Sequence, residues 1–265
     1  MPRYTIAELQ NLKKKKEKIV SLSCYSYPTA KIADSLCEII LVGDSVGMVL
    51  YGMDSTTDVT LEMMISHGKA VCSATNRAFI VVDMPYGTYK NKELALHNAQ
   101  NILQETKAQA IKLEGGQEMA EIIAYLVQHN VPTMAHIGLL PQSCAQRKDL
   151  KIQGKTGEGR QQLVQDVIAV TEAGAFAVVI EGVIKAGADM ICENTDIITI
   201  GIGATNNCDG QILVIDDIIG NSNYTPRFAK IYADSTSLIQ RALTNYKQEI
   251  KSGIFPGRDN FYKNL

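Results

Sequence analysis

Eight short apolar runs punctuate the chain, and they constrain its fold more than any other feature of the sequence. The runs are continuous rather than alternating, which is typical of strands covered on both faces. Most intervals between them carry helical periodicity, as at Met119, Ile122 and Leu126. Strand followed by helix, repeated, predicts a parallel sheet. The runs span residues 19–24, 39–44, 79–83, 110–114, 132–136, 175–181, 197–202 and 212–216.

No linker rich in Pro, Gly or Ser separates the repeats. We therefore predict an α/β protein built as one (β/α)8 TIM barrel, a single catalytic domain over residues 1–265, rather than two Rossmann-like halves. The length of 265 residues suits a barrel, which occupies about 250 residues. Residues 5–16 predict an extra N-terminal helix that closes the barrel floor, and residues 237–252 predict a C-terminal amphipathic helix. The interval 203–211 is too short for a crossover helix, and it is the weak point of the assignment.

The composition is that of a globular protein with a large core, since 46% of the residues are hydrophobic and the net charge is −2. Apart from the lysines at 13–16, the chain lacks the clustered Lys and Arg residues typical of nucleic-acid-binding proteins. It also lacks a run of 18 apolar residues, which would predict a membrane span. Six cysteines without a C-x-x-C pair predict a reducing, cytoplasmic location. The lysines at 13–16 fall on the predicted first helix, where a solvated face is favoured over a patch for nucleic acid or anionic lipid.

Polar side chains stand at the carboxyl end of five successive runs. Runs two to six end at Asp44, Asp83, Glu114, His136 and Glu181. In a (β/α)8 barrel the strand ends build the active site, so these side chains are predicted to converge on one rim. One acidic residue after a strand is normally a helix cap or a turn former. Five polar residues in register are not explained as caps.

Carboxyl groups gathered in one cavity repel one another and raise one another's pKa values unless a cation intervenes. Oxygen ligands of this kind suit a hard divalent ion, Mg²⁺ above all. Lys112 and Glu114 are two residues apart on one strand, so their side chains project to the same face. An ammonium group beside a metal site suits an anionic substrate that bridges the two. The alternative for Lys112 is a structural ion pair with a neighbouring acid.

Three motifs resemble other active sites. Residues 43–47 fit the G-x-S-x-G nucleophile elbow, but that turn should lead straight into a helix, whereas residues 48–52 end in glycine and a polar loop follows. Residues 154–156 resemble the end of a P-loop, but the first glycine of that motif falls on Asp149. Residues 201–203 lack the third glycine of a dinucleotide fingerprint. A serine hydrolase and a nucleotide-binding protein are therefore disfavoured.

An ordered set of segments resembles the ketopantoate hydroxymethyltransferase (3-methyl-2-oxobutanoate hydroxymethyltransferase) family nearly end to end. The segments are 41–48 (LVGDSVGM), 52–56 (GMDST), 83–85 (DMP), 112–116 (KLEGG), 136–143 (HIGLLPQS), 201–204 (GIGA) and 209–214 (DGQILV). The resemblance implies a (β/α)8 barrel related to phosphoenolpyruvate mutase and isocitrate lyase, assembled as a homo-oligomer, a decamer. It also implies transfer of a hydroxymethyl group from 5,10-methylenetetrahydrofolate to 3-methyl-2-oxobutanoate. The product is 2-dehydropantoate, and the step is the first committed one of pantothenate biosynthesis.

The resemblance also implies roles for the residues at the rim. The positions implied to bind one Mg²⁺ are Asp44, Asp83 and Glu114, those implied to bind the oxoacid are Ser45, Asp83, Lys112 and His136, and the implied proton acceptor is Glu181. The chain departs from the family pattern at Lys148-Asp149-Leu150, at Ile184 and at Thr205. Those departures concern loops expected at the rim or at subunit contacts.

The implied chemistry needs a carbanion at C3 of a 2-oxoacid. Chelation by Mg²⁺, with Lys112 and His136 on the remaining oxygens, is expected to stabilise the enolate that forms when Glu181 removes the proton. One alternative is a Mg²⁺-dependent C–C lyase of the isocitrate lyase and phosphoenolpyruvate mutase type that acts on another 2-oxoacid. Another is a barrel without catalytic activity that binds an oxoacid or serves as a scaffold.

Overall fold

The computed structural model describes residues 3–144, 150–222 and 224–262. The chain groups into two compact units, residues 1–215 and residues 216–265. The larger unit holds the eight strands, and the smaller one holds the C-terminal helix. The single catalytic domain over residues 1–265 stays a prediction.

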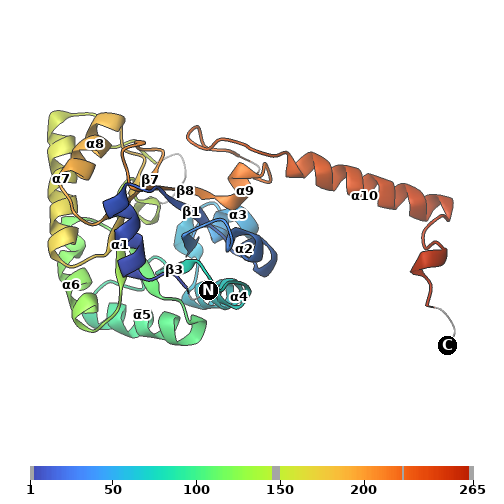
Figure 1. Cartoon of the computed structure of the whole chain (residues 1–265), viewed down its shortest axis with the longest axis horizontal. Coiled ribbons are helices and arrows are strands. Elements are labelled where there is room, and N and C mark those ends of the chain that lie inside the picture. The colour runs from blue at the N-terminus through green and yellow to red at the C-terminus, as the bar shows by residue number, and fades with distance from the viewer. Residues whose placement is uncertain (1–2, 145–149, 223, 263–265) are drawn as a thin grey trace. The chain divides into compact units, whose positions relative to one another are not determined.

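The described residues of the larger unit form a closed barrel in which each strand pairs in parallel with the next and the eighth pairs with the first (Figure 1). The predicted (β/α)8 architecture is therefore confirmed. The eighth strand begins two residues earlier than predicted, at Gly210, and Asp216 lies beyond it. The strands are β1 (Ile19–Ser23), β2 (Ile39–Val42), β3 (Phe79–Asp83), β4 (Ala110–Glu114), β5 (Thr133–Gly138), β6 (Ala177–Glu181), β7 (Ile198–Ile202) and β8 (Gly210–Val214).

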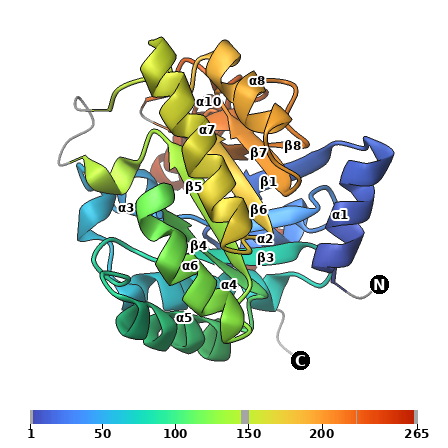
Figure 2. The ribbon, with the colours of Figure 1, turned by 90° about the vertical axis from the view of Figure 1, so that its left-hand side faces the viewer.

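Helices cover the outside of the barrel, and Figure 2 shows α4 to α8 following one another around the strands. Residues 203–209, between β7 and β8, hold no helix, which confirms that this interval is too short for a crossover helix. The helices are α1 (Ile6–Lys15), α2 (Tyr27–Ala33), α3 (Val46–Leu50), α4 (Leu61–Ala74), α5 (Lys92–Thr106), α6 (Ala120–Gln128), α7 (Gly157–Glu172) and α8 (Lys185–Glu193).

Several helices begin at a side chain that caps their free backbone N–H groups. Thr60 begins α4, Asn91 begins α5 and Thr156 begins α7, and each side-chain oxygen accepts a hydrogen bond from the N–H three residues on. Such a cap contributes about 1 kcal/mol to a helix. The strands β2, β3 and β4 are buried along their whole length, as continuous apolar runs predict.

Helix α1 closes the floor of the barrel, as predicted. Its Leu9 is fully buried in a cluster formed mainly by residues at the first three positions of the strands, and a capping box between Thr5 and Glu8 fixes its start. Lys13 departs from the predicted solvated face, because its Nζ lies 2.9 Å from Asp209 Oδ2 and 2.7 Å from the carbonyl oxygen of Ile197. The lysines that follow it at 14–16 are exposed.

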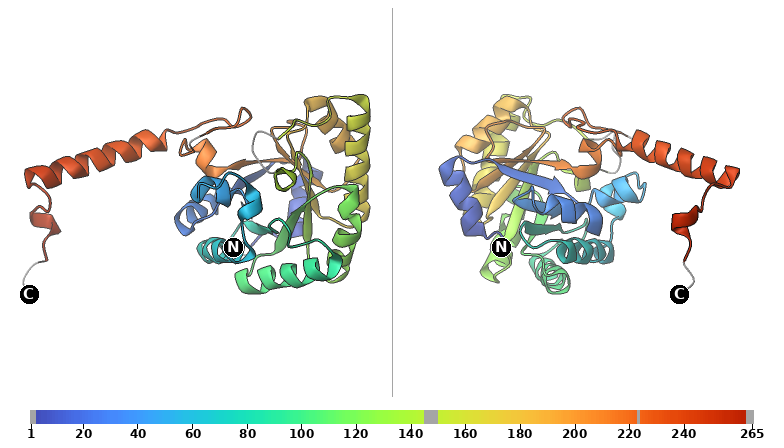
Figure 3. Two further views of the ribbon diagram at one scale, coloured as in Figure 1. Left: turned by 180° about the vertical axis from the view of Figure 1, so that it is seen from behind. Right: turned by 45° about the vertical axis from the view of Figure 1, so that its right-hand side comes forward.

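Residues 216–265 carry α10 (Ser235–Ser252), one long helix that begins at the capping side chain of Asp234 (Figure 3). This unit also holds most of the short helix α9 (Ile215–Ile218) and the 3-10 turn η5 (Arg258–Asn260). Every described residue of α10 is at least partly exposed, although the helix is amphipathic. Within the described part of the chain, no helix combines the length and apolar character needed to cross a membrane.

Candidate functional site

The carboxyl ends of β2 to β6 bring the predicted polar side chains together. The strand register sets Asp83 beside Lys112 and Glu114 beside His136. These four side chains are buried, as is Asp44, which follows β2 by two residues. The sixth, Glu181, ends β6 with 20% of its side chain exposed. The structure therefore assembles the convergent rim that the strand ends predicted.

Asp83 connects two of its neighbours. Its Oδ1 lies 2.9 Å from Lys112 Nζ in a buried ion pair, and its Oδ2 accepts the backbone N–H of Asp44 at 3.0 Å. The predicted alternative for Lys112, an ion pair with a neighbouring acid, is therefore present. It does not exclude substrate binding, because an ammonium group has three donors. Lys112 Nζ also lies 3.3 Å from Nδ1 of His136.

His136 connects the other half of the rim. It lies within β5 rather than at its end, because the strand runs two residues further to Gly138. Its Nδ1 is 3.5 Å from Glu114 Oε1, and its Nε2 is 3.4 Å from Glu181 Oε2. Among the described residues, His136 Nε2 is buried without a hydrogen-bond partner. That ring nitrogen is therefore available to a substrate oxygen near Glu181.

Gln142 and Tyr89 also belong to the site, although the sequence did not single them out. The Gln142 amide Nε2 donates to Asp44 Oδ2 at 2.8 Å, and its backbone N–H donates to Glu114 Oε2 at 2.9 Å. The Tyr89 hydroxyl donates to Oε1 of the same glutamine. Gln142 lies in the segment 136–143, which is one of those that resemble the family. Tyr89 lies in a loop whose sequence shows no helical or strand periodicity.

Ser45 follows Asp44 and begins helix α3 directly, so the expectation that no helix follows residues 43–47 is wrong. The helix is only five residues long and carries no charged side chain, which is why no periodicity marked it. The Ser45 hydroxyl lies 2.7 Å from the hydroxyl of Tyr25. Its neighbour is thus a phenol rather than a histidine, so the arrangement of a serine nucleophile and its base is not seen at this contact.

Burial dominates the acid–base behaviour of three carboxyl groups. Desolvation raises the pKa of Asp44 well above its usual range, and the neighbouring charges of Asp83 and Glu114 raise it further. Desolvation likewise raises the pKa of Asp83, although Lys112 opposes the rise. The pKa of Glu181 is also raised, by desolvation first, while His136 opposes it. A raised pKa brings a carboxyl group toward the range suited to proton transfer at neutral pH.

Lys112 and Glu114 are held in their charged forms. Burial alone would lower the pKa of Lys112, but the surrounding carboxylates, Asp83 first, raise it above its ordinary value. Burial alone would raise the pKa of Glu114, but His136, Lys112 and the Gln142 N–H together lower it. The rim therefore holds a fixed positive charge beside a fixed negative one.

The site suits a divalent cation held by few protein ligands. Asp44, Asp83 and Glu114 are buried with one ammonium group, so a cation would offset their excess negative charge. No group of three or more His, Cys, Asp or Glu side chains within residues 3–144, 150–222 and 224–262 is arranged as a ready-made metal site. Mg²⁺ needs only one or two carboxylates and takes its other oxygens from water and substrate. Asp44 and Asp83 fit that role, and their predicted contact with a metal stays a prediction.

Two of the departures from the family pattern lie in loops that the structure describes. Ile184 precedes α8, and the buried Thr205 donates a hydrogen bond to Asp189 Oδ1 at 2.6 Å. Lys148 and Asp149 lie outside the described residues, and Leu150 lies at the edge of the described part. Thr205 therefore joins the β7–β8 connection to α8.

Comparison with known proteins identifies the family. The family model for ketopantoate hydroxymethyltransferase matches residues 3–258. The chain is 49% identical over 250 residues to the 3-methyl-2-oxobutanoate hydroxymethyltransferase of Anaplasma marginale (strain St. Maries), covering 94% of this chain and 90% of that protein. The chain belongs to the ketopantoate hydroxymethyltransferase family. It is 45% identical over 262 residues to the enzyme of the same name from Bartonella bacilliformis (strain ATCC 35685 / KC583 / Herrer 020/F12,63), covering 98% of this chain and 96% of that one.

Membership of the ketopantoate hydroxymethyltransferase family makes the chain an enzyme, a hydroxymethyltransferase. Its fold recurs in solved structures of low sequence identity. Phosphonopyruvate hydrolase in complex with oxalate and Mg²⁺ superposes with a TM-score of 0.63 at 12% identity, covering 98% of this chain and 92% of that one. A 2,3-dimethylmalate lyase of the phosphoenolpyruvate mutase and isocitrate lyase superfamily gives 0.60 at 12% identity, covering 98% and 91%. The barrel is therefore shared with that superfamily.

Proposed function

We propose that this chain transfers a hydroxymethyl group from 5,10-methylenetetrahydrofolate to 3-methyl-2-oxobutanoate in pantothenate biosynthesis, through an enolate of the oxoacid. The family supports the transferase class and the pathway. The observation that carries the mechanism is the placement of Glu181. Its carboxyl group has a raised pKa and lies 3.4 Å from His136 Nε2, which makes no hydrogen bond to the residues that the structure describes. Glu181, the proposed base, therefore lies beside His136, which is able to bind the substrate oxygen that becomes negatively charged in the enolate.

Binding of the oxoacid falls to the charged and polar groups around that base. The Lys112 ammonium attracts the substrate carboxylate, and His136 Nε2 is available to a substrate oxygen. Ser45 offers a hydroxyl at the same rim. Asp83 orients Lys112 through the ion pair at 2.9 Å and so contributes to substrate binding indirectly. Because these groups are buried, their interactions with substrate are stronger than they would be in water.

Mg²⁺ is the cation that we propose for this site, held by Asp44 and Asp83, with Glu114 bound directly or through water. When bound, it supplies positive charge that stabilises the negative charge of the enolate. The residues of this chain orient the oxygen atoms that would bind the cation and hold them in place. Gln142 does so by donating to both Asp44 and Glu114. Tyr89, hydrogen-bonded to Gln142, holds that amide in turn.

Glu181 would remove the proton from C3 of the bound oxoacid. A positioned base contributes about 10² to 10⁴-fold to such a step. Glu181 follows buried residues of β6, so its carboxylate is poorly hydrated and its basicity is raised. Water releases the one-carbon unit of the folate as formaldehyde, with tetrahydrofolate as the other product. The carbanion then attacks this formaldehyde, and the new alkoxide takes up a proton to give the hydroxymethyl group.

Product analysis tests the transferase proposal. The protein, Mg²⁺, 3-methyl-2-oxobutanoate and 5,10-methylenetetrahydrofolate should together yield 2-dehydropantoate, detected by mass spectrometry, and each omission should abolish it. Cleavage of another 2-oxoacid in place of this product would favour the Mg²⁺-dependent C–C lyase. Neither product nor enolisation would leave a barrel that only binds or serves as a scaffold.

Self-association is the second part of the proposal, with a decamer as the size that the family resemblance implies. Its support is an apolar row on α10, where four side chains are exposed by 44% to 62%. Spacings of three and four residues put them on one helix face, and such a stripe is typical of interaction surfaces. The row consists of Ile239, Leu243, Tyr246 and Ile250.

Sedimentation velocity at micromolar concentration tests the association. We expect a species several times heavier than the 29.0 kDa chain, because the apolar row on α10 would be covered by another copy. Leu243→Glu should shift the distribution toward smaller species. Gln248→Glu adds the same charge at an exposed position on the opposite face of α10 and should have less effect. A stable 29.0 kDa monomer would contradict the proposal.

A cytoplasmic location completes the proposal. Its support is that Cys37, Cys72, Cys144, Cys192 and Cys208 are thiols that are not joined in disulfides. Free thiols are typical of proteins in a reducing compartment, whereas secreted proteins often pair their cysteines. Fractionation of cells that express the full chain should recover it with the cytosolic proteins.

A further inference from the structure

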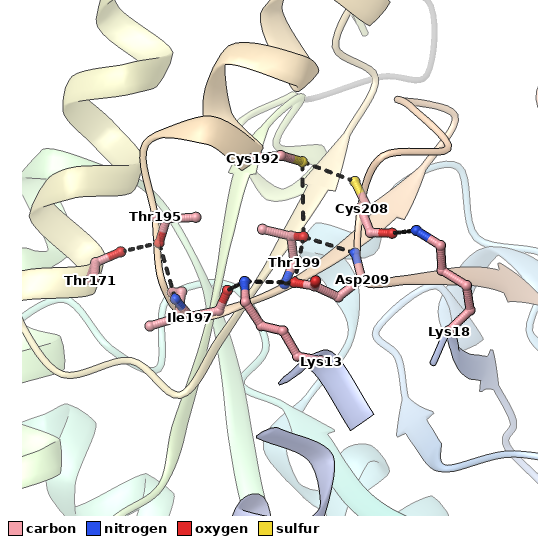
Figure 4. A network of polar contacts seen from close by, with 9 residues as sticks. All are labelled: Lys13, Lys18, Thr171, Cys192, Thr195, Ile197, Thr199, Cys208 and Asp209. Atoms are coloured by element: carbon pink, nitrogen blue, oxygen red, sulfur yellow. Dashed lines mark hydrogen bonds and ion pairs between the residues drawn. The ribbon is translucent and has the colours of Figure 1, made fainter. Parts of the chain in front are cut away.

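Two cysteines meet where the barrel lacks its usual crossover helix. Cys192 lies in the last turn of α8, and Cys208 lies in the short connection between β7 and β8. Their Sγ atoms are 3.6 Å apart (Figure 4). Cys208 is fully buried against β7, where its Sγ lies 3.0 Å from the position that a Cβ on Gly201 would take. The absence of a side chain at Gly201 therefore leaves room for the sulfur.

Hydrogen bonds hold both cysteines in place. The Cys192 thiol donates to Thr199 Oγ1 at 3.9 Å, and Thr199 Oγ1 donates to Asp209 Oδ2 at 2.9 Å (Figure 4). Asp189, three residues before Cys192 on α8, accepts a hydrogen bond at its Oδ1 from Asn207 Nδ2 at 2.8 Å. Helix α8 and the connection are thus joined by a direct hydrogen bond, which helps to keep the two thiols close.

The two thiols differ in exposure and acidity. Cys192 is partly exposed, whereas Cys208 is buried. The hydrogen bond from Cys208 lowers the pKa of Cys192, and the same contact, with burial, raises the pKa of Cys208. Burial raises the pKa of Cys72 to about 11, so that thiol is less readily ionised. Cys192 is therefore suited to react first, because the thiolate is the nucleophile.

We propose that Cys192 and Cys208 form a redox-active dithiol that low-molecular-weight disulfides oxidise to an internal disulfide. The Cys192 thiolate attacks one sulfur of the small disulfide and expels one thiolate, which leaves a mixed disulfide. Cys208 loses its proton, attacks Cys192 Sγ and expels the second small thiolate. Two protein thiols and one small disulfide thus give one protein disulfide and two small thiols.

The bridge would tie the end of α8 to the β7–β8 connection. A disulfide needs its sulfur atoms about 2.05 Å apart, so the pair must close by rotation of the two side chains. Cys192 in a last helical turn and Cys208 in a loop are placed where small shifts are tolerated. The cross-link spans 16 positions and encloses β7, so it should raise the Tm by about 5 to 10 °C. The proposal does not depend on the proposed function.

Peptide mapping of the full chain tests the dithiol. The folded protein is incubated with oxidised glutathione, alkylated and cleaved before aspartate, which separates residues 189–195 from residues 196–208. We expect these two peptides to be linked, with a mass about 2 Da below their sum, and to separate on reduction. Cys208→Ser should instead retain glutathione on Cys192, and Cys72→Ser should keep the link.

Two results would overturn the dithiol. One is complete alkylation of Cys192 and Cys208 in the folded wild type after exposure to oxidised glutathione. The other is a link that disappears in Cys72→Ser. Circular dichroism of each variant confirms that it is folded, and the Tm shift on oxidation should be absent in Cys208→Ser.

Discussion

Replacing Glu181 by glutamine should lower deuterium exchange at C3 of 3-methyl-2-oxobutanoate by at least about 10²-fold. Glutamine keeps the size and hydrogen bonding of Glu181 but cannot accept the proton. Lys112 and His136 remain in place, so binding of the oxoacid should stay within a few-fold of wild type. Exchange followed by NMR and binding followed by calorimetry separate the two effects.

The matched control is Glu172→Gln, a position at the end of α7, which should leave exchange unchanged. In the wild type, exchange should rise with pH through the raised pKa of Glu181, because only the carboxylate accepts a proton. Burial is the first cause of the raised pKa, and the charged groups that modify it are His136, Glu114, Lys112 and Asp83. Exchange within a few-fold of wild type in Glu181→Gln would move the role to another group, His136 first.

Replacing Lys112 by methionine should destabilise the fold by about 3 to 5 kcal/mol at neutral pH. The ammonium is buried and paired with Asp83 at 2.9 Å, so its removal leaves buried carboxylates without a positive partner. Chemical denaturation measures the loss. The control is Lys69→Met, which breaks a pair with Glu105 whose side chains are 51% and 44% exposed and should cost at most about 1 kcal/mol.

The loss of folding stability in Lys112→Met, called the deficit here, should depend on pH in one direction. Without the ammonium, the pKa values of Asp83 and Asp44 should rise further above their unfolded values. The folded variant then binds protons more tightly than the unfolded chain, so its stability falls as the pH rises through those raised values. The deficit should be largest at neutral pH and smaller in acid. A deficit that is small and independent of pH would contradict the assigned ion pair.

Strand positions could be predicted from the sequence because the barrel buries both faces of most strands. Seven of the apolar runs coincide closely with β1 to β7, and the polar residues at their ends converge as expected. The eighth run was displaced, because Gly210 and Gln211 pair within the sheet although the pair forms no apolar run. Backbone pairing, rather than side-chain hydrophobicity, sets that boundary.

Contacts between distant segments could not be predicted in the same way. Gln142 bonds to Asp44 across 98 positions, and Lys13 bonds to Asp209 across 196. Tyr89 lies in a loop, where no periodicity reports which neighbour its hydroxyl will meet. These residues become recognisable only when the closed barrel brings the strand ends and the loops together.

Deuterium exchange at C3 of 3-methyl-2-oxobutanoate, measured by NMR without folate, tests the central claim most directly. The account predicts exchange that requires both the protein and Mg²⁺ and that stops when a chelator is added, because Glu181 removes the proton while the cation stabilises the enolate. Exchange no faster than in buffer with Mg²⁺ present, or exchange unaffected by the chelator, would contradict a metal-assisted enolisation site at this rim.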